Sequence, residues 1–126
     1  MIKVYLLDAN KGDLNHLSKI MRESGDEVQV VGMSADPYEA MAAISLIQPE
    51  ALFLDLHLPN LYGIIVAEQV RERFPQIQIV IVTENKNYAL WAFDQQIVDY
   101  VLKPLDRGRL KSALTRLRSR LELNKA

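Results

Sequence analysis

Four polar residues of this 126-residue chain each follow directly on an apolar run. They are Asp8 after "VYLL", Asp55 after "ALFL", Thr83 after "IVIV" and Lys103 after "YVL". A charge without a partner is costly to bury inside an apolar strand, so each polar side chain is expected at the open end of its strand. Two carboxylates, a hydroxyl and an ammonium group at one place would indicate a shared binding or reaction site. The alternative is that each has a local role, such as capping the next helix or forming a turn.

The segments that carry these residues alternate between short apolar runs and longer stretches of helical period. Strands are predicted over residues 2–8, 27–34, 51–55, 77–83 and 98–103. Gly25, Pro49 and Pro75 mark the ends of the first three helices, and Asp36 with Pro37 marks the start of the second. This alternation predicts an α/β fold with a parallel sheet covered by helices on both faces. Ligands of such sheets gather at the carboxyl ends of the strands, so the four polar residues are expected on one rim.

Composition predicts one globular domain. The chain is 49% hydrophobic and 25% charged, which is enough apolar surface for a core, and it has no cysteine for a disulfide or a thiolate metal site. No apolar run reaches the length of a membrane span, and the N-terminal residues lack the features of a signal peptide. A soluble, cytoplasmic protein without a membrane partner is therefore expected.

Charge is distributed unevenly along the chain. Residues 106–126 hold seven Lys or Arg and two acidic residues and so carry +5, whereas the first 105 residues carry −6. A basic terminal helix could contact nucleic acid, but no aromatic residue is interleaved with these charges. We therefore interpret the basic run as a solvated helix face, and direct binding of DNA by this chain is not expected.

The polar residues lie in motifs that resemble those of response-regulator receiver domains. The stretch "FLDLHLPNLYG" resembles the phosphoacceptor loop of that family, and "IVIVT" and "DYVLKP" resemble its threonine and lysine motifs. The resemblance covers residues 1–126 as one receiver domain and implies a doubly wound, flavodoxin-like (βα)5 fold with strand order 2-1-3-4-5. Residues 88–114 are particularly similar to receivers that precede LytTR-type or related DNA-binding output domains. An output domain that is absent from this chain, following a basic helix at about 106–123, is therefore implied.

The resemblance also implies roles for individual residues. Asp55 would accept a phosphoryl group from a sensor histidine kinase, while Lys103 and Thr83 would contact the phosphate. A Mg²⁺ ion would be held by Asp8, Asp55 and the main-chain carbonyl of His57. Such a protein is a signalling receiver that controls transcription and not an enzyme in its own right.

The same family suggests how the signal leaves the site. Thr83 and Tyr100 would act as the switch pair, and the Lys103–Pro104 bond is a candidate for the cis form. The surface formed by the fourth helix, fifth strand and fifth helix would carry output contacts and a homodimer. Helical periodicity places Leu90 and Trp91 on the outer side of the fourth helix and Phe93 on the inner side, so Leu90 and Trp91 are the predicted interface residues. The alternative is a rotated helix with Trp91 in the core, since a wholly exposed tryptophan is uncommon.

Two residues depart from the family pattern. Ala9 replaces the acid that usually ligates the metal, and Glu84 stands where a small residue usually leaves room for the phosphate. Metal binding should be weakened, and Asn10, Asp13 or Glu84 could compensate, although Asp13 is better explained by the start of the first helix. These departures favour an alternative, a pseudo-receiver that acts only through protein contacts. An Asp-nucleophile phosphatase ranks lowest, because His57 stands where that chemistry would need a second acid.

Overall fold

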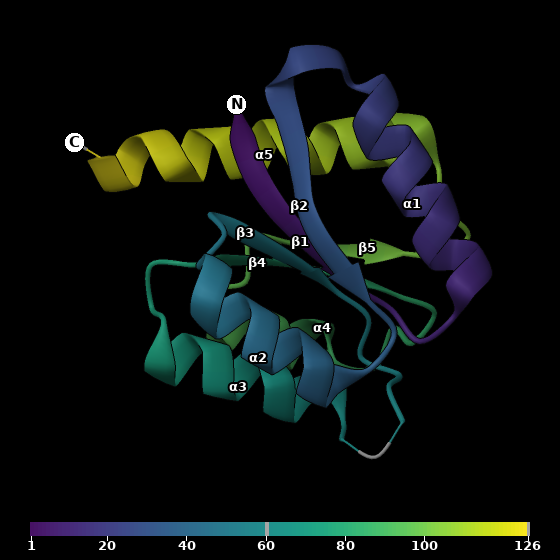
Figure 1. Cartoon of the computed structure of the whole chain (residues 1–126), viewed down its shortest axis with the longest axis vertical. Coiled ribbons are helices and arrows are strands. Elements are labelled where there is room, and N and C mark those ends of the chain that lie inside the picture. The colour runs from purple at the N-terminus through teal and green to yellow at the C-terminus, as the bar shows by residue number, and fades with distance from the viewer. Residues whose placement is uncertain (60, 126) are drawn as a thin grey trace.

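A sheet of five parallel strands lies between two layers of helices in the computed structural model, which describes residues 1–59 and 61–125 (Figure 1). The strands are β1 (Ile2–Leu7), β2 (Val28–Ser34), β3 (Ala51–Leu54), β4 (Gln78–Thr83) and β5 (Asp99–Leu102). The helices are α1 (Lys11–Glu23), α2 (Pro37–Ile47), α3 (Gly63–Arg73), α4 (Ala89–Asp94) and α5 (Arg107–Lys125), with a short 3-10 helix at Gly25–Glu27. The strand order β2-β1-β3-β4-β5 confirms the predicted doubly wound fold. Asn60, in the predicted phosphoacceptor loop, and Ala126 lie outside the described residues.

Local signals start the first two helices. The Asp36 side chain accepts a hydrogen bond of 3.0 Å from the Glu39 backbone N–H at the start of α2, as predicted. At α1 the capping residue is Asn10, whose side chain accepts a 2.9 Å hydrogen bond from the Asp13 backbone N–H. Asn10, and not Asp13, is therefore the capping residue of α1, which leaves the Asp13 carboxylate in the first turn available for another contact.

Each face of the sheet has its own apolar core. Phe53 and Val80 point into a cluster with α1 and α5, whereas Leu52 and Ile79 point into a cluster with α2, α3 and α4. This alternation is the two-residue period of a strand, and it explains why β3 and β4 are apolar at almost every position. Among the described residues, no helix has the length and apolar character needed to cross a bilayer.

The orientation of α4 differs from the prediction. Trp91 is partly buried and packs against the α2–α3–α4 core beside Ala92, whereas Phe93 is 80% exposed and Leu90 is 75% exposed. The prediction was right for Leu90 and wrong for Trp91 and Phe93. A helix of six residues gives too short a pattern to set its rotation, and the larger indole surface is the one that the core takes up.

The charges of α5 are also used differently from the prediction. Four of its arginines form ion pairs with other parts of the domain, so the helix is not simply a solvated basic face. The pairs are Arg107 with Glu23, Arg109 and Arg116 with Asp99, and Arg118 with Glu27. The apolar side of the helix, including Leu110, Leu114 and Leu117, is buried against the sheet as its spacing predicts. The helix ends at Lys125, two residues beyond the predicted end.

Asp99 is the most deeply buried acid in these pairs. Arg109 donates two hydrogen bonds of 2.7 Å to its carboxylate, and Arg116 donates one of 2.9 Å. Burial is the largest single influence and would raise the pKa of Asp99, but the hydrogen bonds and charge of Arg109, the Tyr100 N–H and the charge of Arg116 together outweigh it and lower the pKa. The charged form is thus favoured in the folded state, and the Asp99 carboxylate ties β5 to α5.

Replacing Asp99 should therefore destabilise the domain. Asp99→Asn is expected to lower the free energy of unfolding by about 1–3 kcal/mol at pH 7, because two arginines lose their charged acceptor. The folded-state pKa lies below the unfolded value, so the stabilisation is complete above an unfolded pKa of about 4 and is lost as the pH falls through the folded value. Urea unfolding across pH 2–8 would measure both effects.

A matched control is Glu27→Gln, which removes the ion pair with Arg118. Both of these side chains are more than a third exposed, so the expected loss is at most about 1 kcal/mol. Equal losses in the two variants would contradict a special role for Asp99.

Candidate functional site

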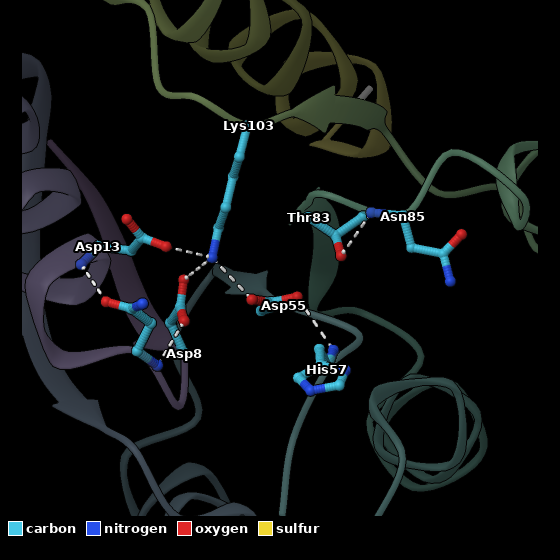
Figure 2. Close-up of polar contacts among 8 residues, drawn as sticks. Asp8, Asp13, Asp55, His57, Thr83, Asn85 and Lys103 are labelled. Atoms are coloured by element: carbon cyan, nitrogen blue, oxygen red, sulfur yellow. Dashed lines mark hydrogen bonds and ion pairs between the residues drawn. The ribbon is translucent and has the colours of Figure 1, made fainter.

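The carboxyl ends of β1, β3 and β5 bring two acids and a lysine into direct contact (Figure 2). The Lys103 ammonium nitrogen lies 2.8 Å from an Asp8 oxygen and 2.7 Å from an Asp55 oxygen. All three side chains are almost completely buried. The peptide bond between Lys103 and Pro104 is cis.

The sequence offered Asp13 only as one possible substitute for the acid that Ala9 replaces, and the structure places its carboxylate 2.8 Å from the Lys103 nitrogen. Asp13 stands in the first turn of α1, on the segment that follows β1. Asp13 follows Asp8 by only five residues, and the start of α1 folds back over the end of β1. This short separation was the signal in the sequence that could have placed Asp13 at the site. Lys103 therefore contacts three carboxylates that come from three different parts of the chain.

Backbone groups orient two of these carboxylates. The Asn10 N–H donates a 2.9 Å hydrogen bond to Asp8 Oδ1, and the His57 N–H donates a 3.0 Å hydrogen bond to Asp55 Oδ1. In each acid the other oxygen, Oδ2, contacts Lys103. The loops that follow β1 and β3 thus hold the carboxylates in one orientation.

Burial and charge shift the pKa values in this cluster. Burial raises the pKa of Asp8, and the hydrogen bond from Lys103 acts in the opposite direction. Burial also disfavours the ammonium form of Lys103, but hydrogen bonds to Asp13, Asp55 and Asp8 outweigh it and raise its pKa. Lys103 is accordingly positively charged at neutral pH.

A cavity of about 570 Å³ opens beside the cluster. It is lined by Ala9, Asn10, Asp13, Asp55, His57, Thr83, Glu84, Asn85 and Lys103. Thr83 is almost fully buried at the end of β4, and its hydroxyl accepts a hydrogen bond of 3.4 Å from the Asn85 N–H. Three of the four strand-end residues line this cavity, whereas Asp8 is not among the lining residues. The exposed Glu84 stands at its wall.

Tyr100 connects the neighbouring loop to β5. Its hydroxyl donates a hydrogen bond to the Asn85 carbonyl, two residues after Thr83. The side chain is partly buried and packs against the core that contains Ala92 of α4. A movement of the loop after Thr83 would therefore change the hydrogen bond of the Tyr100 hydroxyl.

The charges of the cluster suit a divalent cation. Asp8, Asp13 and Asp55 with Lys103 leave two negative charges, and carboxylate oxygens are ligands that Mg²⁺ prefers. Within residues 1–59 and 61–125, no group of three or more acidic or histidine side chains is arranged to hold a metal ion. Mg²⁺ commonly uses only one or two carboxylates and completes its shell with carbonyl oxygen and water, so these residues fit such an ion.

Comparisons with known proteins agree with this geometry. A family model described as "Response regulator receiver domain" matches residues 4–115. The transcriptional regulatory protein BtsR of Salmonella typhi is 36% identical over 119 residues, which are 94% of this chain and 48% of that protein. BtsR of Escherichia coli K12 is 34% identical over 120 residues, with the same coverage. The chain thus spans about half the length of these relatives.

Solved structures give the same result. The response regulatory domain of mrkE from Klebsiella pneumoniae superposes with a TM-score of 0.88 at 25% identity, covering 97% of this chain and 99% of that one. The REC domain of AraT from Geobacillus stearothermophilus gives a TM-score of 0.90 at 25% identity, covering 99% and 98%. The isolated REC domain of RcsB from Salmonella enterica, solved with the phosphomimetic BeF3⁻, gives 0.85 at 26% identity, covering 94% and 88%.

The backbone around Asp55 depends on the glycine that begins α3. A Cβ atom on Gly63 would meet the Leu56 Cα and would lie 2.5 Å from the Asp55 carbonyl oxygen. Gly63→Ala should therefore force the Asp55 segment to move and lower the free energy of unfolding by about 1–3 kcal/mol, as measured by urea unfolding.

Gly108→Ala is the matched control. A Cβ atom there would meet only the Asp106 side chain, at 3.3 Å, and alanine favours the helix. If Gly63→Ala were as well tolerated as Gly108→Ala, close packing at Gly63 would not be what fixes the Asp55 segment.

Proposed function

The chain belongs to the response regulator receiver family, and on this basis we propose that it is a phosphoacceptor receiver in which Asp55 takes a phosphoryl group from a sensor histidine kinase. Proteins of this family are signalling proteins of two-component systems. The observation that carries the proposal is the contact of 2.7 Å between the Asp55 carboxylate and the Lys103 ammonium group, at the wall of a cavity that Thr83 also lines.

The proposed reaction is a phosphoryl transfer between two side chains. An Asp55 oxygen attacks phosphorus, a new P–O bond forms, and the bond between phosphorus and the imidazole nitrogen of the donor breaks, so that the electron pair leaves with the imidazole. Lys103 supplies a positive charge beside the transferred oxygens, and the Thr83 hydroxyl can donate a hydrogen bond to one of them. His57 N–H keeps the carboxylate oriented before the attack.

We also propose Mg²⁺ as the cofactor of this site. When bound, the ion neutralises charge on the phosphoryl oxygens and orients them. Asp55, Asp8 and the His57 carbonyl are the ligands that the family resemblance implies. Asp8 is held by Lys103 and by the Asn10 N–H, so it serves the site through its charge and through the position of Lys103.

A pseudo-receiver remains the second candidate because of Ala9 and Glu84, which both line the cavity. Two observations favour the phosphoacceptor. Asp55, Thr83 and Lys103 are all present and face the same cavity, and Glu84 is exposed, so that its carboxylate can turn toward solvent.

The output is proposed to be transcriptional. The BtsR relatives are transcriptional regulatory proteins about twice as long as the part that matches, so we propose that a LytTR-type or related output domain binds DNA on behalf of this receiver.

The effect of phosphorylation would reach the output domain through Thr83, Asn85 and Tyr100, whose hydrogen bonds join the site to β5. The surface of α4, β5 and α5 would then change its contacts, including those of a homodimer. We place the protein in the cytoplasm, where its kinase partner would act.

The phosphoacceptor assignment has a direct test. After incubation with acetyl phosphate and Mg²⁺, the wild type should gain one phosphoryl mass and Asp55→Asn should gain none, because an amide cannot act as the carboxylate nucleophile. Intact-mass spectrometry gives the result. Asp94→Asn, which changes an exposed acid of α4, should label like the wild type, and persistent labelling of Asp55→Asn would exclude Asp55 as the acceptor.

The dimer surface is tested by the exposed apolar residues of α4. Phe93→Ala and Leu90→Ala should each weaken self-association by about fivefold or more in the presence of BeF3⁻, because each removes apolar area from the contact. The dimer should be weak, since so small a patch falls below the size of a stable interface. Sedimentation velocity with and without BeF3⁻ measures the dissociation constant.

Two controls separate contact from folding. Leu46→Ala removes a leucine of α2 that is even more exposed than Leu90, and it should leave association unchanged. Trp91→Ala should instead lower the free energy of unfolding by about 1–3 kcal/mol, because the indole packs on the core. An unaltered dissociation constant in both Phe93→Ala and Leu90→Ala would rule out this face.

A further inference from the structure

We propose that Asp13 supplies the carboxylate that Ala9 lacks, so that Asp13 and Asp55 together hold the divalent cation. This inference rests on the proposed function, since it concerns the ion that phosphoryl transfer to Asp55 would use. It changes the ligand set that the family resemblance implied, in which Asp8 was the second carboxylate.

The position of Asp13 carries the inference. Asp13 lines the cavity together with Asp55 and His57, whereas Asp8 is not among the lining residues. About a third of the Asp13 side chain is exposed, but only 3% of the Asp8 side chain is. A hydrated Mg²⁺ ion keeps several of its waters, so it needs a carboxylate that faces the open cavity. Asp13 meets this requirement and Asp8 does not.

One oxygen of the Asp13 carboxylate is also available to bind a metal ion. Its Oδ2 contacts Lys103, and among the described residues its Oδ1 accepts no hydrogen bond. Oxygens of three carboxylates, those of Asp8, Asp13 and Asp55, lie 2.7–2.8 Å from one positively charged atom, the Lys103 Nζ. The three groups can therefore approach a single cation. The cluster still carries two negative charges after Lys103 is counted. A divalent ion beside Asp13 and Asp55 would neutralise them.

Two other candidates for the missing ligand are less suitable. The Asn10 side-chain oxygen is engaged at 2.9 Å by the Asp13 backbone N–H, where it caps α1. Glu84 lines the cavity but is exposed, and within the described part of the chain it forms no ion pair with Lys103. The cap at Asn10 instead helps Asp13, because it fixes the first turn of α1 and so the direction of the Asp13 side chain.

The test is a calorimetric titration of Mg²⁺ into the wild type, Asp13→Asn and Glu84→Gln at constant ionic strength. Asp13→Asn should weaken binding by about tenfold or more, the scale seen when groups that support a metal site are removed. Glu84→Gln removes the same charge from the same cavity and should change the dissociation constant much less. Thermal unfolding of each variant checks that the domain remains folded.

A rescue variant shows whether Asp13 binds the metal ion itself or only holds Lys103 in place. Adding Ala9→Asp to Asp13→Asn should restore Mg²⁺ affinity, since the new carboxylate would stand at the position that the family uses. Failure of this rescue, or equal affinity of Asp13→Asn and wild type, would overturn the inference. A larger loss in Glu84→Gln than in Asp13→Asn would overturn it as well.

The outcome can be told apart from that of the proposed function. If acetyl phosphate labels Asp55 while Asp13→Asn binds Mg²⁺ normally, only the role of Asp13 is wrong. If Mg²⁺ binding depends on Asp13 but Asp55 is never labelled, the metal site stands and the phosphoacceptor function is wrong. A wild type that binds no Mg²⁺ would overturn the inference directly.

Discussion

The contact of the Lys103 ammonium group with three carboxylates is the interaction on which the site depends. Burying one lysine or one acid alone would cost several kcal/mol, so Asp8, Asp55 and Lys103 are retained in the interior only because they contact one another. The three acids come from the end of β1, the start of α1 and the end of β3, and the lysine comes from the end of β5. Removing one partner would therefore affect both the cavity and the packing of the strand ends.

The parallel sheet brings the lysine and the three carboxylates together. Strands that run in the same direction end on the same edge, so residues 48 positions apart can share one hydrogen bond, as Asp55 and Lys103 do. Short backbone contacts then fix the details. Gly63 lets α3 start against the Asp55 carbonyl, and the Asn10 and His57 N–H groups orient the acids.

The far side of the domain is connected to this edge by polar contacts. Tyr100 bonds to the loop after Thr83, and the next residue in the chain toward the N-terminus, Asp99, is held by Arg109 and Arg116 of α5. A shift of Thr83 would thus act on β5, which its ion pairs join to α5. Part of the basic charge of α5 is therefore used within the domain itself, where it pairs with Asp99.

The strand order was implied by the family resemblance, whereas the sequence alone determined the strands, their parallel direction and the placement of Asp8, Asp55, Thr83 and Lys103 at strand ends, because two-residue and 3.6-residue periods and helix caps are local signals. It could not determine which further side chain would reach the site. Asp13 reaches Lys103, 90 residues away, only after α1 has packed beside β1. It also could not set the rotation of α4, because six residues hold too little pattern and the core decided that Trp91 is covered and Phe93 is exposed. Both outcomes depend on contacts between distant segments, which exist only in the folded chain.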